Sequence, residues 1–202
     1  MTEHARADAL LDFWFGHAAL EPSAARKRNK TWFQARPSFD ALLRSRYVDL
    51  PYRLSAGEFP DWGSAPRTAL ARIVALDQVP RNVFRGTPAA FAFDPLAQEA
   101  AIAAVEQEFD RALHPIEAVF VYLPFEHAED RDLQQRSIEL FGRLRSRSPA
   151  ALDDLFDSYV DYAHRHAKVI AQFGRFPHRN TTLGRAETPA ETTYLAGGGQ
   201  RF

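Results

Sequence analysis

The residues best suited to chemistry gather in one stretch, Tyr162 to Arg185, which reads YAHRHAKVIAQFGRFPHRNTTLGR. Its second half is unusually cationic for a chain whose formal net charge is −1. Arginine can grip a carboxylate or a phosphate through two parallel hydrogen bonds, so we interpret this loop as a candidate anion site. The candidate ligand-binding residues of this stretch are His166, Arg175, Arg179, Asn180 and Arg185, and His178 is a candidate catalytic residue.

The first half of the stretch has the pattern of an amphipathic helix. Apolar residues recur every three or four positions from Leu152 to Phe173, and His166 falls inside their stripe. His164 lies about 200° further round such a helix. The two histidines therefore cannot bind one metal ion from an unbroken helix, and we predict no metal site. A histidine in an apolar stripe is also typical of a hydrogen-bonded core residue.

A second candidate group, Glu126 and His127, lies in the segment VYLPFEHAED. The next helix is expected to carry Glu129 and Asp130 in its first turn, where the helix dipole favours acidic residues. Glu126 and His127 come before that turn and need another explanation. Together with His178 they could supply the acid and base groups of a hydrolase.

A third candidate group follows a helix that begins near Ser64 and Pro66. Asp77 is expected on the apolar side of this helix, where its carboxylate needs a partner such as an arginine. The next residues contribute Arg81, Asn82 and Arg85 as candidate ligand-binding residues.

The pattern Arg-Asn-x-x-x-Gly occurs twice, from Arg81 to Gly86 and from Arg179 to Gly184, each time shortly after a proline. One interpretation is that the same helix-terminating loop occurs twice, with glycine adopting a positive φ. The other is that the two loops converge and present their arginines to one anion. The sequence does not decide between them.

The elements that must position these residues are predicted to be helices only. Prolines mark the starts or ends of amphipathic segments of about 10 to 22 residues, and no segment alternates as a strand would. The segment 116–123, IEAVFVYL, is apolar nearly all round and should be buried on most sides. Pro124 is expected to end it. The predicted architecture is all-α, built from stacked antiparallel helix pairs.

Length and composition indicate a single domain, residues 1–202, with a mobile tail at 196–202. Basic and acidic residues number 25 and 26, so the overall charge does not favour a nucleic-acid partner. The chain contains no cysteine, which excludes disulfides and a cysteine nucleophile. No signal pattern and no apolar run of about 20 residues is present, so we expect a cytoplasmic protein without a membrane partner.

Three long segments, beginning at Leu76, Val121 and Tyr162, together with DFWFG near the start, resemble the bacterial proteins grouped as domain-of-unknown-function family 924. The resemblance covers nearly the whole chain. It implies an all-helical fold similar to tetratricopeptide-repeat superhelices. It implies no activity, because the family has none to transfer.

Three functional interpretations remain at this stage. The first is a binding protein for an anionic small molecule or an acidic peptide, and the second is a hydrolase in which arginines stabilise developing negative charge. In the third, the polar residues only join helices. No phosphate-binding loop, nucleophile elbow or dinucleotide fingerprint is present, so the sequence does not indicate which cofactor, if any, the protein uses. The first two require that Glu126 or His127 lie near the 174–185 loop.

Overall fold

The secondary structure is helical throughout the part of the chain that the computed structural model describes, residues 3–16 and 21–202. No strand occurs in those residues, so the all-α prediction is confirmed. The main helices are α1 (Glu3–Phe15), α2 (Pro22–Phe33), α3 (Pro37–Tyr47), α4 (Leu50–Ser55), α5 (Pro66–Ile73), α6 (Val79–Val83), α7 (Asp94–Glu106), α8 (Phe109–Ala112), α9 (Pro115–Glu126), α10 (Arg131–Ser146), α11 (Asp153–Phe173) and α12 (Pro189–Ala196).

Proline in the first turn begins many of these helices, among them α2, α5, α9 and α12. This position suits proline because the first N–H groups of a helix have no intrahelical acceptor. The cap predicted at Ser64 is displaced by one residue, since Ala65 precedes α5 and the Ser64 hydroxyl donates to Asp61 instead. Asp130 does cap α10, where its side chain accepts from the N–H groups of Asp132 and Leu133.

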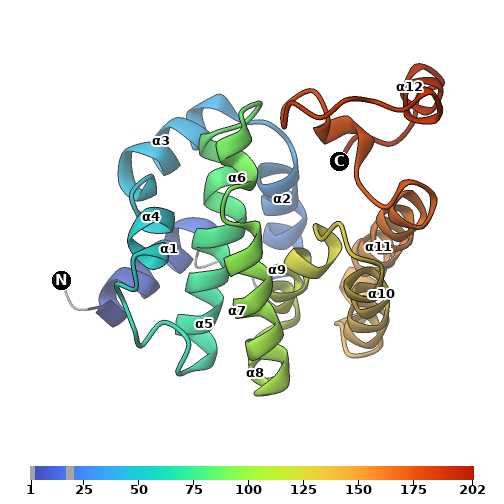
Figure 1. Ribbon diagram of the computed structural model, residues 1–202. Helices are drawn as coiled ribbons and strands as arrows, with labels where there is room; N and C mark the ends of the chain where they lie inside the picture. The colour runs from blue at the N-terminus through green and yellow to red at the C-terminus, as the bar shows by residue number, and fades with distance from the viewer. Residues whose placement is uncertain (1–2, 17–20) are drawn as a thin grey trace.

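Helix α9 lies at the centre of the molecule, packed against α5, α7 and α10 (Figure 1). All of its residues are apolar except Glu117 and Glu126, and every residue after Pro115 is buried. Phe120 is 1% exposed and meets the rings of Trp14, Phe15 and Trp32 within 6 Å. Aromatic pairs at this separation add to the free energy gained by burial. The prediction that this segment is buried on most sides is confirmed.

The expectation that Pro124 ends this helix was wrong. Helix α9 continues through Pro124 to Glu126, and the N–H of His127 still donates to the carbonyl oxygen of Leu123 at 2.8 Å. Proline removes one backbone hydrogen bond, but here Leu123, Pro124 and Phe125 are all buried, and their packing holds the helix together. As a result Glu126 is the last residue of α9 and His127 is its C-cap, deep in the molecule.

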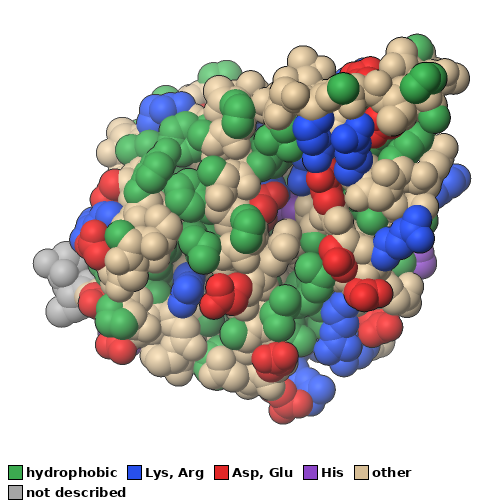
Figure 2. Space-filling view, viewed as in Figure 1, with side chains coloured by type: hydrophobic (Ala, Val, Ile, Leu, Met, Phe, Trp, Pro, Cys, Tyr) green, Lys and Arg blue, Asp and Glu red, His purple; other side chains and the backbone are tan. Residues whose placement is uncertain are grey.

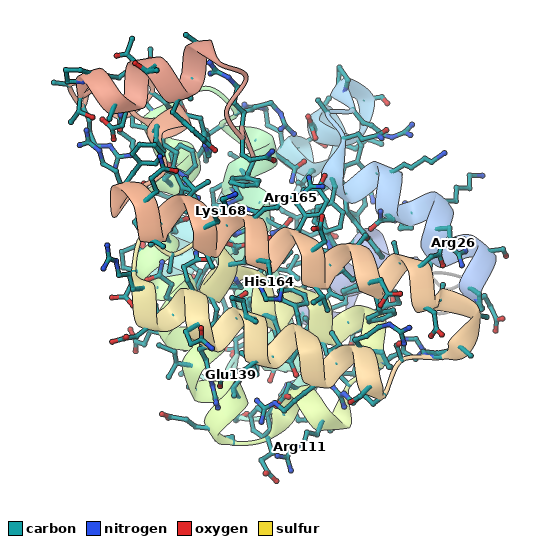
Figure 3. The ribbon with its side chains drawn as sticks, turned by 90° about the vertical axis from the view of Figure 1, so that its right-hand side faces the viewer. Arg26, Arg111, Glu139, His164, Arg165 and Lys168 are labelled. Atoms are coloured by element: carbon teal, nitrogen blue, oxygen red, sulfur yellow. The ribbon has the colours of Figure 1, made fainter. Side chains whose placement is uncertain are left out.

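Helices α10 and α11 pack together along one side of the molecule, and the chain then folds back toward α6 (Figure 1). Helix α11 ends where predicted, at Gly174, whose φ is +71°. The outer surface of α11 carries His164, Arg165 and Lys168, whereas His166 is 3% exposed (Figure 3). The expected mobile tail ends against the fold, with the ring of Phe202 stacked on that of His166 at 3.5 Å between centroids.

Candidate functional site

Asp77 is the central residue of the site and is 1% exposed. Its Oδ1 lies 2.8 Å from Nη1 of Arg81 and 2.8 Å from Nδ1 of His127, while Oδ2 accepts from the side-chain amide of Gln78. Burial alone would raise the pKa of this carboxyl group. The charge of Arg81 and the contact with His127 outweigh burial and lower the pKa to about 2, so Asp77 is ionised.

A π-helical turn, Val74–Gln78, places Asp77 between α5 and α6. Pro80, two residues after this turn, cannot donate a hydrogen bond to the preceding turn, where its ring would also crowd the carbonyl group of Leu76. A wider turn at this point accommodates the proline, and such turns often occur at functional sites. The fully buried run Val74 to Pro80 thereby presents two polar side chains, Asp77 and Gln78, to the interior.

His127 is held by Asp77 in one tautomer. The carboxylate can only accept, so Nδ1 of His127 carries its hydrogen toward Asp77. Burial, and after it the charge of Arg81, lowers the pKa of His127, so the ring is neutral near pH 7 and Nε2 is unprotonated. Within the described residues Nε2 has no hydrogen-bond partner. Asp77 and His127 together have the arrangement of an oriented general base.

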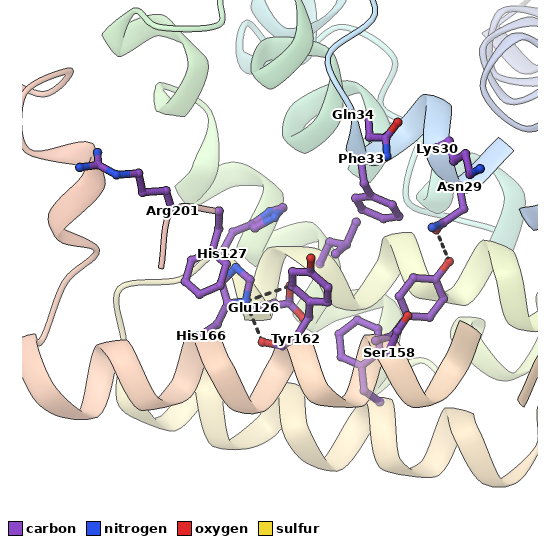
Figure 4. A pocket seen from close by; sticks show the side chains of 14 residues that line it. Asn29, Lys30, Phe33, Gln34, Glu126, His127, Ser158, Tyr162, His166 and Arg201 are labelled. Carbon is purple, nitrogen blue, oxygen red and sulfur yellow. Dashed lines mark hydrogen bonds and ion pairs between the residues drawn. The ribbon is translucent and has the colours of Figure 1, made fainter. Parts of the chain in front are cut away.

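Glu126 lies beside this pair and is 4% exposed. Burial, and after it the charge of Asp77, raises the pKa of Glu126 to about 8, which leaves the carboxyl group protonated at neutral pH. Its Oε1 lies 3.3 Å from Nδ1 of His166 (Figure 4).

The proton of Glu126 has no acceptor at His166. Nδ1 of His166 lies 2.8 Å from the carbonyl oxygen of Tyr162, which can only accept, so this nitrogen must carry a hydrogen. Oε1 of Glu126 lies 3.3 Å from this nitrogen without a hydrogen bond between them. The carboxyl proton of Glu126 therefore has no acceptor in the described part of the chain.

The arginines of the site differ in how well they are paired. Arg81 makes two hydrogen bonds to Asp94, at 2.8 and 2.9 Å, in addition to its contact with Asp77. Arg179 is 6% exposed and approaches Asp94 only to 3.6 Å. Its side chain makes no hydrogen bond to any described residue, and its Nε is buried without a partner. The guanidinium group lies over the rings of Phe91 and Phe176, 4.7 and 4.4 Å from their centroids.

The positive charge of Arg179 therefore has a carboxylate 3.6 Å away and, among the described residues, no hydrogen-bond acceptor to stabilise it. Burial, and after it repulsion from Arg81, lowers its pKa to about 10, although Asp94 acts in the opposite direction. A buried donor without an acceptor costs about 1–3 kcal/mol, and more when it is charged.

Two cavities open onto these groups, and in the space-filling view basic and acidic side chains gather where the C-terminal segment meets the rest of the molecule (Figure 2). We call the first the arginine cavity; it has a volume of about 280 Å³, and its polar lining includes Gln78, Arg81, Asn82, Arg85, His127, His178, Arg179 and Thr182. Among the described residues that line it none is acidic.

The second, the aromatic cavity, has a volume of about 360 Å³ (Figure 4). Its lining includes Lys30, Phe33, Leu123, Glu126, His127, Phe141, Tyr159, Tyr162, His166 and Phe202. Phe33, His127 and Phe202 line both cavities, so His127 stands where the two meet.

Most of the residues singled out from sequence line these cavities. Arg81, Asn82, Arg85, His127, His178 and Arg179 line the arginine cavity, and Glu126, His127 and His166 line the aromatic one. Within the two Arg-Asn-x-x-x-Gly loops, Gly86 and Gly184 both have positive φ, at 77° and 64°. Both loops also contribute an arginine to the arginine cavity, so the two interpretations of the repeat are compatible.

Three predicted ligand-binding residues lie outside both cavities and are engaged elsewhere. Arg185 makes two hydrogen bonds to Glu129, at 2.5 and 2.9 Å. Asn180 is fully buried and accepts from Nε of Arg185 at 3.0 Å. Arg175 binds both oxygens of Glu191. Because they lie outside both cavities, and because Arg175 and Arg185 are already paired with carboxylates, we leave Arg175, Asn180 and Arg185 out of the proposed site.

Sequence reasoning missed several residues of the site. Asp94 is the first residue of α7, and its carboxylate joins Arg81 to Arg179. Phe202 falls in a tail without a pattern. In the sequence, Asp94 followed by Pro95 indicates only the start of a helix. The fold shows that this end of α7 faces the two arginine loops.

No group of three or more histidine, cysteine or acidic side chains arranged to hold a metal ion occurs within residues 3–16 and 21–202. In the same residues no helix is long and apolar enough to cross a membrane.

These features describe an all-helical protein with a buried, ion-paired site between its C-terminal segment and its central helices. The chain belongs to the bacterial family of proteins of unknown function DUF924, which matches residues 10–199. It is similar to a protein of unknown function from Agrobacterium tumefaciens, ATU0120, whose structure is solved. The two share 34% identity over 98% of this chain and 100% of the other, with a TM-score of 0.81. No protein with a curated function matches the chain.

Proposed function

We propose that this protein binds a small carboxylate in the arginine cavity. The observation that carries the proposal is Arg179, a buried guanidinium group that lines an open cavity and makes no hydrogen bond within the described residues. A bound anion would supply the missing acceptors. Hydrogen bonds between two charged groups contribute about 1.5–3 kcal/mol each.

The neighbouring arginines favour a ligand that places one carboxylate group, rather than a phosphate, at the deep end of the cavity. Both terminal nitrogens of Arg81 already bind Asp94, and Arg81 also meets Asp77. Arg85 is 52% exposed at its side chain and lies 3.6 Å from Asp40. Only Arg179 therefore has donors to spare at depth, with Arg85 near the opening. One guanidinium group matches one carboxylate, whereas a phosphate dianion needs more donors.

The size of the site favours a small molecule over a peptide. The arginine cavity has about 280 Å³ and the aromatic cavity about 360 Å³, within the range of small-ligand sites. His178 adds a neutral polar group, because burial, and after it the charge of Arg179, lowers its pKa to about 4. Its Nδ1 is buried and has no partner in the described chain.

Titration calorimetry with succinate and with inorganic phosphate tests the proposal. We expect succinate to bind and phosphate to bind more weakly. Arg179→Met keeps an unbranched apolar stem, so the fold should persist while succinate affinity falls 10- to 100-fold, the loss of one or two charged hydrogen bonds. Lys168→Gln removes a charge from the exposed face of α11 and serves as the control (Figure 3). Equal succinate affinity in wild type and Arg179→Met would overturn the proposal.

A further inference from the structure

Two groups at the junction of the two cavities are equipped for more than binding. His127 has a free, unprotonated Nε2 and is oriented by Asp77, 2.8 Å away. Glu126 carries a proton that no described residue accepts. Both side chains line the aromatic cavity, and His127 also lines the arginine cavity. A base and an acid that face one cavity from adjacent residues are the minimum for acid–base catalysis.

Glu126 and His127 are close enough to act on one small substrate. The rings of His127 and His166 lie 6.4 Å apart between centroids, and Glu126 lies 3.3 Å from Nδ1 of His166. Figure 4 shows the three side chains converging on the same end of the cavity. Glu126 and His127 therefore reach the same cavity from adjacent positions of the chain.

The hydroxyl groups of Ser158 and Tyr159 on the wall of the aromatic cavity are already hydrogen-bonded within the protein. The chain has no cysteine. The hydroxyl group of Ser158 donates to the carbonyl oxygen of Leu155 at 2.6 Å, and that of Tyr159 donates to Asn29 at 2.7 Å. Burial raises the pKa of the Tyr159 phenol, so it does not ionise near neutral pH. Water is the nucleophile that these groups can activate.

We infer that the two cavities form one active site, which hydrolyses an ester with a free carboxylate on its acyl part and an apolar or aromatic alcohol part. The inference rests on the proposed carboxylate binding at Arg179, which would hold the acyl part. The alcohol part would lie among Phe33, Tyr159 and Tyr162. His127 is the general base and Glu126 the general acid.

The reaction balances with water as the only second reactant. Nε2 of His127 takes a proton from water, and the oxygen adds to the ester carbonyl carbon, whose π electrons move to its oxygen. When this intermediate collapses, the C–O bond to the alcohol breaks and the bonding pair leaves on the alkoxide oxygen. Glu126 protonates that oxygen. The proton on His127 then returns to Glu126 through water, so the products are one acid and one alcohol.

The test compares two monoesters of succinic acid, one with 4-nitrophenol and one with benzyl alcohol. 4-Nitrophenolate leaves without protonation, whereas benzyl alkoxide needs an acid. Glu126→Gln should therefore lower kcat/KM at least 100-fold for the benzyl ester and only a few-fold for the nitrophenyl ester. His127→Gln should lower both by 100-fold or more. A role of Glu126 in folding alone would lower both esters equally.

Controls separate this inference from the proposed function. Glu139→Gln, on the outer face of α10, should change neither rate (Figure 3). Succinate binding by the Glu126 and His127 variants shows that they are folded. If succinate binds through Arg179 but neither ester is hydrolysed faster than in buffer, the catalytic inference is wrong and the binding function stands. If succinate does not bind at all, the proposed function fails as well.

Discussion

The pKa of Glu126 makes stability fall as pH rises, and one substitution isolates the effect. Glu126 is 4% exposed, and burial with the nearby charge of Asp77 raises its pKa from 4.5 to about 8. The folded protein therefore binds this proton more tightly than the unfolded chain does. Between these two values the folded state holds more protons, and the free energy of unfolding decreases with increasing pH. Glu126→Gln keeps the shape and removes the titration.

The magnitude follows from the two pKa values. Compared with a side chain that does not titrate, Glu126 lowers the free energy of unfolding by about 1 kcal/mol at pH 5 and by about 4 kcal/mol at pH 8. Wild type should therefore lose about 3 kcal/mol relative to Glu126→Gln between pH 5 and pH 8. Other groups that face Glu126, namely Asp77, His127 and His166, titrate in both proteins and cancel in the difference to a first approximation.

Urea unfolding of both proteins at half-unit steps between pH 5 and pH 8 measures this difference. An infrared difference spectrum of wild type minus Glu126→Gln at pH 7 should also contain the carbonyl band of a protonated carboxyl group. Two stability curves that run parallel from pH 5 to pH 8 would refute the reasoning. They would mean that Glu126 is ionised in the folded state, and the general-acid role would fall with it.

Three further predictions concern other parts of the site. Asp77→Asn should destabilise the protein by about 2 kcal/mol at pH 6, and because the pKa of Asp77 is lowered to about 2, urea unfolding should show this gap closing as pH falls from 4 toward 2. Gly174→Ala should lower the free energy of unfolding by about 1–2 kcal/mol because φ is +71° there. Gly142→Ala, inside α10 with open space around it, should raise it by up to about 1 kcal/mol, and urea unfolding of both variants measures the two effects. Phe202→Ala should uncover His166 and speed its acylation by diethyl pyrocarbonate several-fold, measured by mass spectrometry, with exposed His164 as the unchanged internal reference.

Local sequence patterns predicted the helices well and their connections less well. The apolar stripe from Leu152 to Phe173 was sufficient for α11, because side chains three or four residues apart share one face of a helix. Pro124 does not end α9 as its sequence context predicts, because the packing that holds the helix together at this position comes from distant segments. The same limit applies to Asp94 and Phe202, which join the site through contacts with residues outside their own helix or tail. Asp94 meets Arg179, 85 positions away, and Phe202 meets His166, 36 positions away. The tetratricopeptide-like superhelix stays a prediction from resemblance.

The third interpretation, in which polar groups only join helices, explains part of the site and leaves the rest open. Arg185 with Glu129 and Arg81 with Asp94 are saturated pairs, as a structural role requires. Unpartnered atoms also occur away from the cavities, on neutral groups such as Ser137 and on charged ones such as Arg6 and Arg72.

Arg179, His127 and Glu126 are different. Each has a donor or acceptor without a partner among the described residues, each faces a cavity, and together they are a cation, a base and an acid. Of the three, Arg179 has a buried donor without an acceptor in the described chain, which costs the folded protein about 1–3 kcal/mol, and more because the group is charged. A network that served packing alone would gain stability if these positions were filled by apolar side chains of similar size. The binding and hydrolysis experiments therefore address the groups that the fold leaves unexplained.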